Sequence, residues 1–276
     1  MSPLENNATV YGSTFGPGPT ILLMHGLMGR GRTWLRHLPW LRELGRVVVY
    51  DASWHRGRDE RPDLEADDGE SIATERFVEE AVAVLEAHAD GPAAVVGHSM
   101  GGLHAWCLAA ARPDLVRALV VEDMAPDFRG RTLGPWEPWL ESWPTEFADE
   151  AAVDALVGPI AGQYFRESFD QIPGSGGYRL HGHMDVWCAI AAQWGERDYW
   201  AQWEAVRAPT LLVEAAHGVT PEGQMREMAS RNPHARHMVV DAGHLAHDAE
   251  PDQFRRSVTE FLREAGVSSN GASSRY

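Results

Sequence analysis

The sequence predicts an α/β protein with a mostly parallel β-sheet flanked by helices and a helical cap inserted between two core strands. Short apolar runs rich in valine recur along the chain, and such runs are typical of strands that helices cover on both faces. Helical patterns separate these runs, and one long interval, residues 124–208, interrupts the alternation. The runs lie at residues 21–24, 47–50, 93–96, 118–121, 210–213 and 237–240.

Four helices are expected between or after these strands, at residues 33–44, 71–89, 100–112 and 251–265. Ser71 is the predicted N-cap of the second helix, whose apolar residues recur at steps of three and four. Pro251 suits the first turn of the last helix.

The interrupted alternation gives the domain organisation. Residues 1–123 and 209–265 should form the α/β core. The interval at 124–208 is too long for an ordinary connection, so we expect it to carry helices of its own and to form a cap over one edge of the sheet. The polar residues 266–276 predict a disordered tail.

Composition restricts the partners. The chain has 276 residues and a formal net charge of −16, which argues against nucleic acid or an anionic membrane surface as a partner. No apolar stretch is long enough to span a bilayer, and the N-terminus lacks a leader pattern. Its two cysteines cannot build a disulfide framework, and the His181–His183 pair has no visible third ligand. We therefore expect a cytoplasmic protein that acts on small molecules without metal or cofactor, in an unknown oligomeric state.

One serine lies where a strand pattern gives way to a helix pattern. Residues 97–101 read GHSMG and match G-x-S-x-G, in which the serine occupies a strained turn at the edge of a sheet. Gly97 and Gly101 allow the strand and helix backbones to approach closely. The pattern predicts Ser99 as a nucleophile, with a structural turn as the alternative.

A serine nucleophile needs a base, which should follow a later strand. His244 directly follows the last predicted strand, and Gly243 permits the turn before it. His247, three residues later, is the alternative, to which we assign a supporting role.

The oxyanion of an acyl-transfer transition state needs backbone N–H donors. The first residue after the serine, Met100, should supply one, and Leu27 in the HGLMG loop should supply the other. We expect His25, Gly26 and His98 to border the substrate site, His25 by bracing the loop.

Four segments, HGLMG, GHSMGG, VVEDMAP and AGHLAHDAEPDQF, resemble the α/β-hydrolase superfamily over nearly the whole chain. They are similar to a branch of small acyl-esterases and thioesterases. The resemblance implies the α/β-hydrolase fold and a Ser-His-acid triad. It also implies two places for the acid. In many members the acid follows the strand that here begins TLLV, where this chain has His217. In the acyl-esterase branch it follows the preceding strand, where this chain has Asp123. We expect Asp123 to be the acid, with Glu214 as the alternative.

The chain also departs from its relatives after residue 50, where many carry a glycine-rich loop. Here the bulky Trp54 is expected to border the mouth of the site, because loops after parallel strands gather at one edge of the sheet.

These expectations combine into one hypothesis: a serine hydrolase that cleaves a carboxylic ester or thioester of a small, largely apolar acyl substrate through an acyl-enzyme. Two alternatives stay open. The same triad serves cofactor-free haloperoxidases and carbon–carbon bond hydrolases, and the scaffold also serves non-catalytic ligand-binding proteins.

Overall fold

The structure is a computed structural model that describes residues 7–66, 69–132 and 138–269. Within these residues the centre is a seven-stranded sheet in the order β1-β3-β2-β4-β5-β9-β10. β1 pairs antiparallel with β3, and the other neighbouring strands are parallel. The strands are β1 (Ala8–Tyr11), β2 (Thr20–Met24), β3 (Arg46–Tyr50), β4 (Ala93–His98), β5 (Val116–Glu122), β9 (Thr210–His217) and β10 (Ala235–Gly243).

The predicted apolar runs all lie in strands of this sheet. Helices cover most of these runs on both faces, whereas the run in the edge strand β10 includes the exposed Val239. In β2, Ile21 and Leu23 pack into the core layer on one face, while Leu22 and Met24 pack into the layer on the other. The edge strand β1 carries no such run, since its residues are half-buried or exposed. It therefore escaped prediction.

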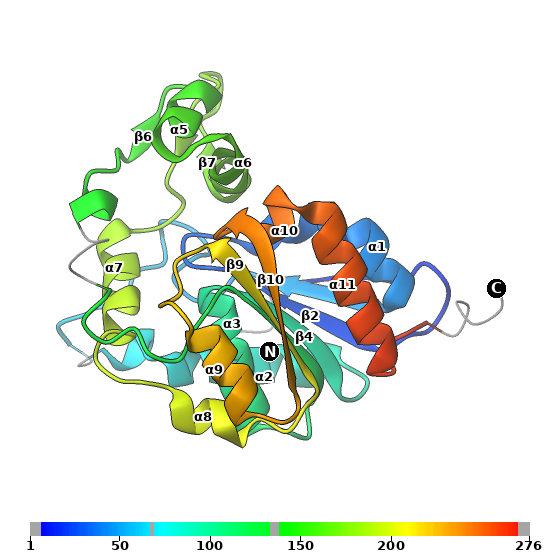
Figure 1. Cartoon of the computed structure of the whole chain (residues 1–276). Helices are drawn as coiled ribbons and strands as arrows, with labels where there is room; N and C mark the ends of the chain where they lie inside the picture. The colour runs from blue at the N-terminus through cyan, green and yellow to red at the C-terminus, as the bar shows by residue number, and fades with distance from the viewer. Residues whose placement is uncertain (1–6, 67–68, 133–137, 270–276) are drawn as a thin grey trace.

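Helices cover each face of the sheet (Figure 1). One layer consists of α2 (Thr74–His88), α3 (Met100–Ala111), α8 (Trp200–Ala205) and α9 (Gln224–Arg231). The other consists of the 3-10 helix η2 (Gly31–His37), α1 (Leu38–Leu44) and α11 (Pro251–Glu264).

The predicted N-cap of α2 was wrong. Ser71 lies within the 3-10 helix η3 (Glu70–Ile72), which follows Gly69 in a left-handed conformation, and α2 begins at Thr74 after Ala73.

Residues 124–208 carry helices, as expected, and also a small antiparallel sheet in the order β6-β8-β7. Its strands have two residues each, too short to leave a periodic signal in the sequence. Part of this segment, with α5, α6 and the small sheet, lies above the carboxyl ends of the core strands (Figure 1). Its elements are β6 (Glu146–Phe147), α5 (Glu150–Val157), α6 (Pro159–Ser168), β7 (Asp170–Gln171), β8 (Tyr178–Arg179) and α7 (Met184–Gln193), followed by α8.

Two residues assigned to the tail pack on the core instead. Val267 and Ser269 are fully buried, and the Ser269 hydroxyl donates a hydrogen bond to the Glu43 carbonyl at 2.9 Å. An apolar contact and a satisfied hydroxyl extend the ordered core to residue 269. The remainder of the predicted tail, 270–276, lies outside the described residues.

No helix in the described ranges combines the length and the apolar character needed to cross a membrane.

Candidate active site

Ser99 occupies the sharp turn between β4 and α3. Its backbone has φ 52° and ψ −122°, a conformation that L-residues rarely adopt, so the surrounding structure must hold it. A Cβ at residue 97 would lie 2.3 Å from the Gly101 carbonyl oxygen, and one at residue 101 would lie 2.3 Å from the Met24 carbonyl oxygen. Neither position tolerates a side chain. The two glycines therefore let strand and helix close tightly around a raised serine.

Asp123 and His244 meet at the same edge of the sheet. The distance from His244 Nδ1 to Asp123 Oδ2 is 2.6 Å, at the short end for a hydrogen bond to a carboxylate. Asp123 is fully buried, whereas 30% of the His244 side chain is exposed. His244 follows β10 directly, and Asp123 follows β5. The carboxylate thus contacts the Nδ1 edge of an imidazole that also lines two cavities.

The Asp123 carboxylate is held by the end of β9 and by the loop that follows this strand. Its Oδ1 accepts the Ala215 N–H at 3.2 Å, and its Oδ2 accepts the Val219 N–H at 3.1 Å. A Cβ at residue 218 would lie 2.2 Å from Asp123 Oδ2, so Gly218 allows this loop to pass over the carboxylate. Asp123 itself has φ 44°, which turns its side chain from the end of β5 toward the end of β9.

The other acid considered from the sequence is engaged elsewhere. Glu214 Oε2 lies 2.5 Å from His237 Nε2. His217, at the position where many relatives carry the acid, pairs with Asp241 at 3.0 Å, and both side chains are largely exposed.

A second acid–histidine pair lies behind the first and was not predicted as a pair. The buried Glu122 carboxylate accepts the backbone N–H of His247 at 2.9 Å and its ring Nδ1–H at 2.8 Å. Burial favours the neutral imidazole, but the adjacent Glu122 carboxylate outweighs it and raises the pKa of His247. The signal was present in the sequence, since Glu122 precedes Asp123 and His247 follows His244 by three residues.

His98 connects the serine turn to the histidine segment. Its Nε2–H donates to the His244 carbonyl at 3.0 Å, and the two rings lie 4.6 Å apart. Burial holds the pKa of His98 well below its usual value. A neutral His98 therefore fixes the backbone of His244.

Two apolar cavities meet at this site. The smaller, of about 150 Å³, is lined by Ser99 and His244 together with the side chains of the β5–cap connection and the cap. The larger, of about 630 Å³, lies between His244 and the cap helices α5 and α6. Leu27, Trp139, Val219 and His244 line both cavities. Among the described residues, no Asp, Glu, Lys or Arg lines either cavity.

The two predicted oxyanion donors are placed differently, since Met100 lines neither cavity. Leu27 lines both cavities, and Met100 is the first residue of α3, where helical N–H groups have no partner within the helix. A Cβ at residue 26 would lie 2.7 Å from His98 Nδ1 and 3.3 Å from the Ser99 Cβ, so Gly26 lets this loop pack against the serine turn.

His25 and Trp54 support loops and line neither of the two cavities. The buried His25 donates from Nδ1 to the Gly26 carbonyl at 2.8 Å and accepts the Ala52 N–H at Nε2, and its burial lowers its pKa. The Trp54 indole N–H donates to the Ser71 carbonyl at 2.8 Å, which holds the ring away from the cavities.

The comparisons with known proteins agree with this architecture. A family profile described as "Alpha/beta hydrolase family" matches residues 21–257. A pyrrolizixenacetamide deacetylase from Xenorhabdus hominickii is 26% identical over 264 residues, which cover 91% of this chain and 94% of the relative.

Solved structures share the fold. The chain is similar to an E-2-(acetamidomethylene)succinate hydrolase, with a TM-score of 0.77 and 21% identity, over 93% of this chain and 95% of the other. It is also similar to the enol-lactonase from Burkholderia xenovorans LB400, with a TM-score of 0.73, the same identity and the same coverage.

Proposed function

Because this chain belongs to the alpha/beta hydrolase family, we propose that it is a serine hydrolase that cleaves a carboxylic ester or thioester with a small, largely apolar acyl group. Ser99 Oγ attacks the acyl carbon while His244 takes its proton. The resulting imidazolium gives that proton to the leaving oxygen or sulfur as its bond to carbon breaks. Water then attacks the acyl-enzyme by the same route and releases the acid.

The contact between Asp123 and His244 carries the proposal. Because a carboxylate accepts at Nδ1 over 2.6 Å, the proton of a neutral His244 resides on Nδ1, and the lone pair is on Nε2. Nε2 is the atom that must act as the base. Asp123 also stabilises the imidazolium that forms, and its two backbone N–H bonds hold it in place.

The cavities indicate the substrate class. An anionic substrate would need a cationic partner, and neither cavity has one among its described lining residues. The smaller cavity contains Ser99 and is bordered by Met124, Phe128 and Trp194, so it suits a short acyl group. The larger cavity then receives the alcohol or thiol part. Leu27 and Met100 supply the N–H donors for the oxyanion.

The decisive experiment combines covalent labelling with turnover. The wild-type chain should be labelled by a fluorophosphonate and should hydrolyse aryl esters of acetate and butyrate. Ser99→Ala should lose both properties, while Ser230→Ala, which removes an exposed hydroxyl on α9, should keep them. Absence of labelling in a folded wild-type chain would favour a ligand-binding protein and overturn the proposal.

The substrate panel should extend beyond esters. The deacetylase relative acts, by its name, on an acetamide. An aryl acetamide cleaved faster than the matched acetate would reassign the leaving group to an amine while leaving the role of Ser99 unchanged.

A further inference from the structure

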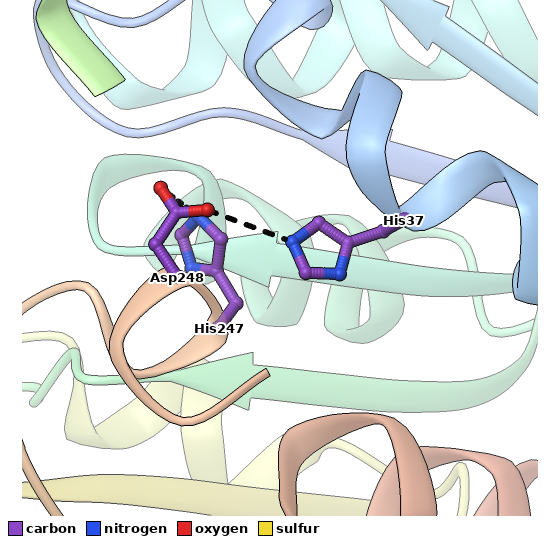
Figure 2. Close-up of side chains that lie close together, drawn as sticks. All are labelled: His37, His247 and Asp248. Atoms are coloured by element: carbon purple, nitrogen blue, oxygen red, sulfur yellow. Dashed lines mark ion pairs between the residues drawn. The ribbon is translucent and has the colours of Figure 1, made fainter. Parts of the chain in front are cut away.

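Three side chains from distant parts of the chain converge away from the two cavities: His37 at the end of η2, and His247 and Asp248 in α10 (Ala246–Ala249) (Figure 2). One potential ligand atom from each of these three side chains lies within 4.8 Å of the other two. His37 Nε2 is 3.8 Å from Asp248 Oδ1, and His247 Nε2 is 3.7 Å from Asp248 Oδ2. These distances are too long for hydrogen bonds.

Each member of this cluster presents a buried atom without a hydrogen-bond partner among the described residues: His37 Nε2, His247 Nε2 and Asp248 Oδ2. The His37 and His247 side chains are 4% and 0% exposed, and that of Asp248 is 3% exposed. Burying unpaired polar atoms is costly, and three of them on neighbouring side chains form a set of potential metal ligands. We propose that His37, His247 and Asp248 bind a divalent transition-metal ion, with Zn²⁺ as the best match. This inference is independent of the proposed function.

The donor chemistry suits such an ion. Two imidazole nitrogens and one carboxylate oxygen are common zinc ligands. Zinc bonds of about 2.0–2.1 Å place the donors of a tetrahedral site about 3.3 Å apart. The His247 Nε2–Asp248 Oδ2 separation of 3.7 Å exceeds this by about 0.4 Å. His37 Nε2 lies 3.8 Å from the other carboxylate oxygen, Oδ1, so the Asp248 carboxylate must rotate to present one oxygen to an ion that both histidines bind.

Glu122 orients one of the ligands. Because its carboxylate accepts from His247 Nδ1, the ring turns its Nε2 toward Asp248. A carboxylate behind a ligating histidine fixes the tautomer and raises the basicity of the metal-binding nitrogen.

Two neighbouring groups compete with the ion, each weakly. Arg36 lies 3.4 Å from Asp248 Oδ1, the oxygen that also faces His37, so a rotation of the carboxylate must bring Oδ2 to the ion if this contact is kept. The Trp40 indole N–H is 3.4 Å from His37 Nδ1, a long contact that is given up when His37 carries its proton on Nδ1. A cavity of about 230 Å³, lined by His37 and Asp248 among others, gives the ion a route to the cluster.

The bound ion would join segments that the chain separates widely. His37 precedes α1, and His247 and Asp248 directly follow the segment that carries His244. The ion should therefore stabilise the folded chain by fastening α10 to the helices on that face. At free Zn²⁺ about a hundredfold above Kd, the ratio of unfolded to folded chain should fall about a hundredfold.

The test uses the untagged full-length chain after removal of metal. Calorimetric titration with Zn²⁺ should give one equivalent bound, and the melting temperature should rise with Zn²⁺ concentration. Co²⁺ in place of Zn²⁺ should give a tetrahedral absorption spectrum. His37→Gln and Asp248→Asn should abolish this binding, and Glu122→Gln should weaken it by about 10- to 100-fold.

The matched control is His217→Gln, which breaks an exposed histidine–aspartate pair that has a 3.0 Å contact. It should bind Zn²⁺ like the wild type. The proposed site would be overturned if the wild type did not bind Zn²⁺. It would also be overturned if Zn²⁺ binding persisted in both His37→Gln and Asp248→Asn, or if His217→Gln lost binding to the same extent. If the ligand variants do not fold, the wild-type titration and Co²⁺ spectrum decide, and an octahedral spectrum would reject the proposed ligands.

Discussion

Replacing Asp123 by asparagine changes one atom of a fully buried side chain and tests the proposed relay. In the wild type, Oδ1 accepts one backbone N–H, while Oδ2 accepts another together with the His244 Nδ1–H. An asparagine has one acceptor oxygen and one NH₂ group for the same three donors. If its NH₂ takes the place of Oδ2, it donates to His244 Nδ1 and moves the imidazole proton to Nε2. Nε2 then has no lone pair with which to take the proton of Ser99.

The expected loss of kcat is about 10⁴-fold, the effect of the wrong histidine tautomer in a serine triad. At 1.36 kcal/mol per tenfold change, this equals about 5.4 kcal/mol of transition-state stabilisation. In either orientation of the amide, the buried backbone N–H of Ala215 or the partly buried one of Val219 loses its acceptor. The free energy of unfolding should therefore fall by about 1–3 kcal/mol.

The assay is steady-state hydrolysis of an activated aryl acetate, with urea unfolding measured on the same samples. The matched variant is Glu214→Gln, which alters an acid–histidine contact of 2.5 Å that does not involve His244. It should keep kcat within about tenfold. A chain that retains its kcat in Asp123→Asn but loses several powers of ten in Glu214→Gln would refute the assignment of the acid.

Three further outcomes are expected. Leu140→Ala widens the smaller cavity and should shift kcat/KM toward esters with longer acyl groups. Leu156→Ala widens the larger cavity and should leave the acyl preference unchanged in the same ester series. Equal shifts in the two variants would reject the placement of the acyl group in the smaller cavity. Gly218→Ala pushes its loop off the triad carboxylate and should lower kcat at least about tenfold, measured beside Gly57→Ala, whose added methyl group meets no atom within 4 Å. Burial lowers the pKa of His104 to about 3, so the unfolded chain binds a proton there that the folded chain excludes, and stability should fall as pH drops below about 6.5. Urea unfolding between pH 6 and 4 should show that the free energy of unfolding of His104→Gln depends less steeply on pH than that of the wild type, by about 1.4 kcal/mol per pH unit. Equal slopes in the two proteins would contradict a buried neutral imidazole at His104.

The amino-acid sequence was sufficient for the α/β class and for the serine turn, because both depend on local patterns. Valine-rich runs buried on two faces identify parallel strands without knowledge of their neighbours. Gly97 and Gly101 likewise report a local steric requirement, since a side chain at either position would meet the backbone within 2.3 Å. The edge strand β1 and the two-residue strands of the cap left no comparable pattern.

The proposed acid and the proposed zinc site both depend on contacts that only folding in three dimensions creates. Sequence order leaves Asp123 and Glu214 as rivals, because each lies at or near the end of a strand. In the structure the two acids have different partners. Asp123, which has a positive φ, contacts His244 and the end of β9, while Glu214 lies within β9 and contacts His237 of β10. His37 and Asp248 carry no mutual signal along the chain, since contact between them arises from the packing of η2 against α10.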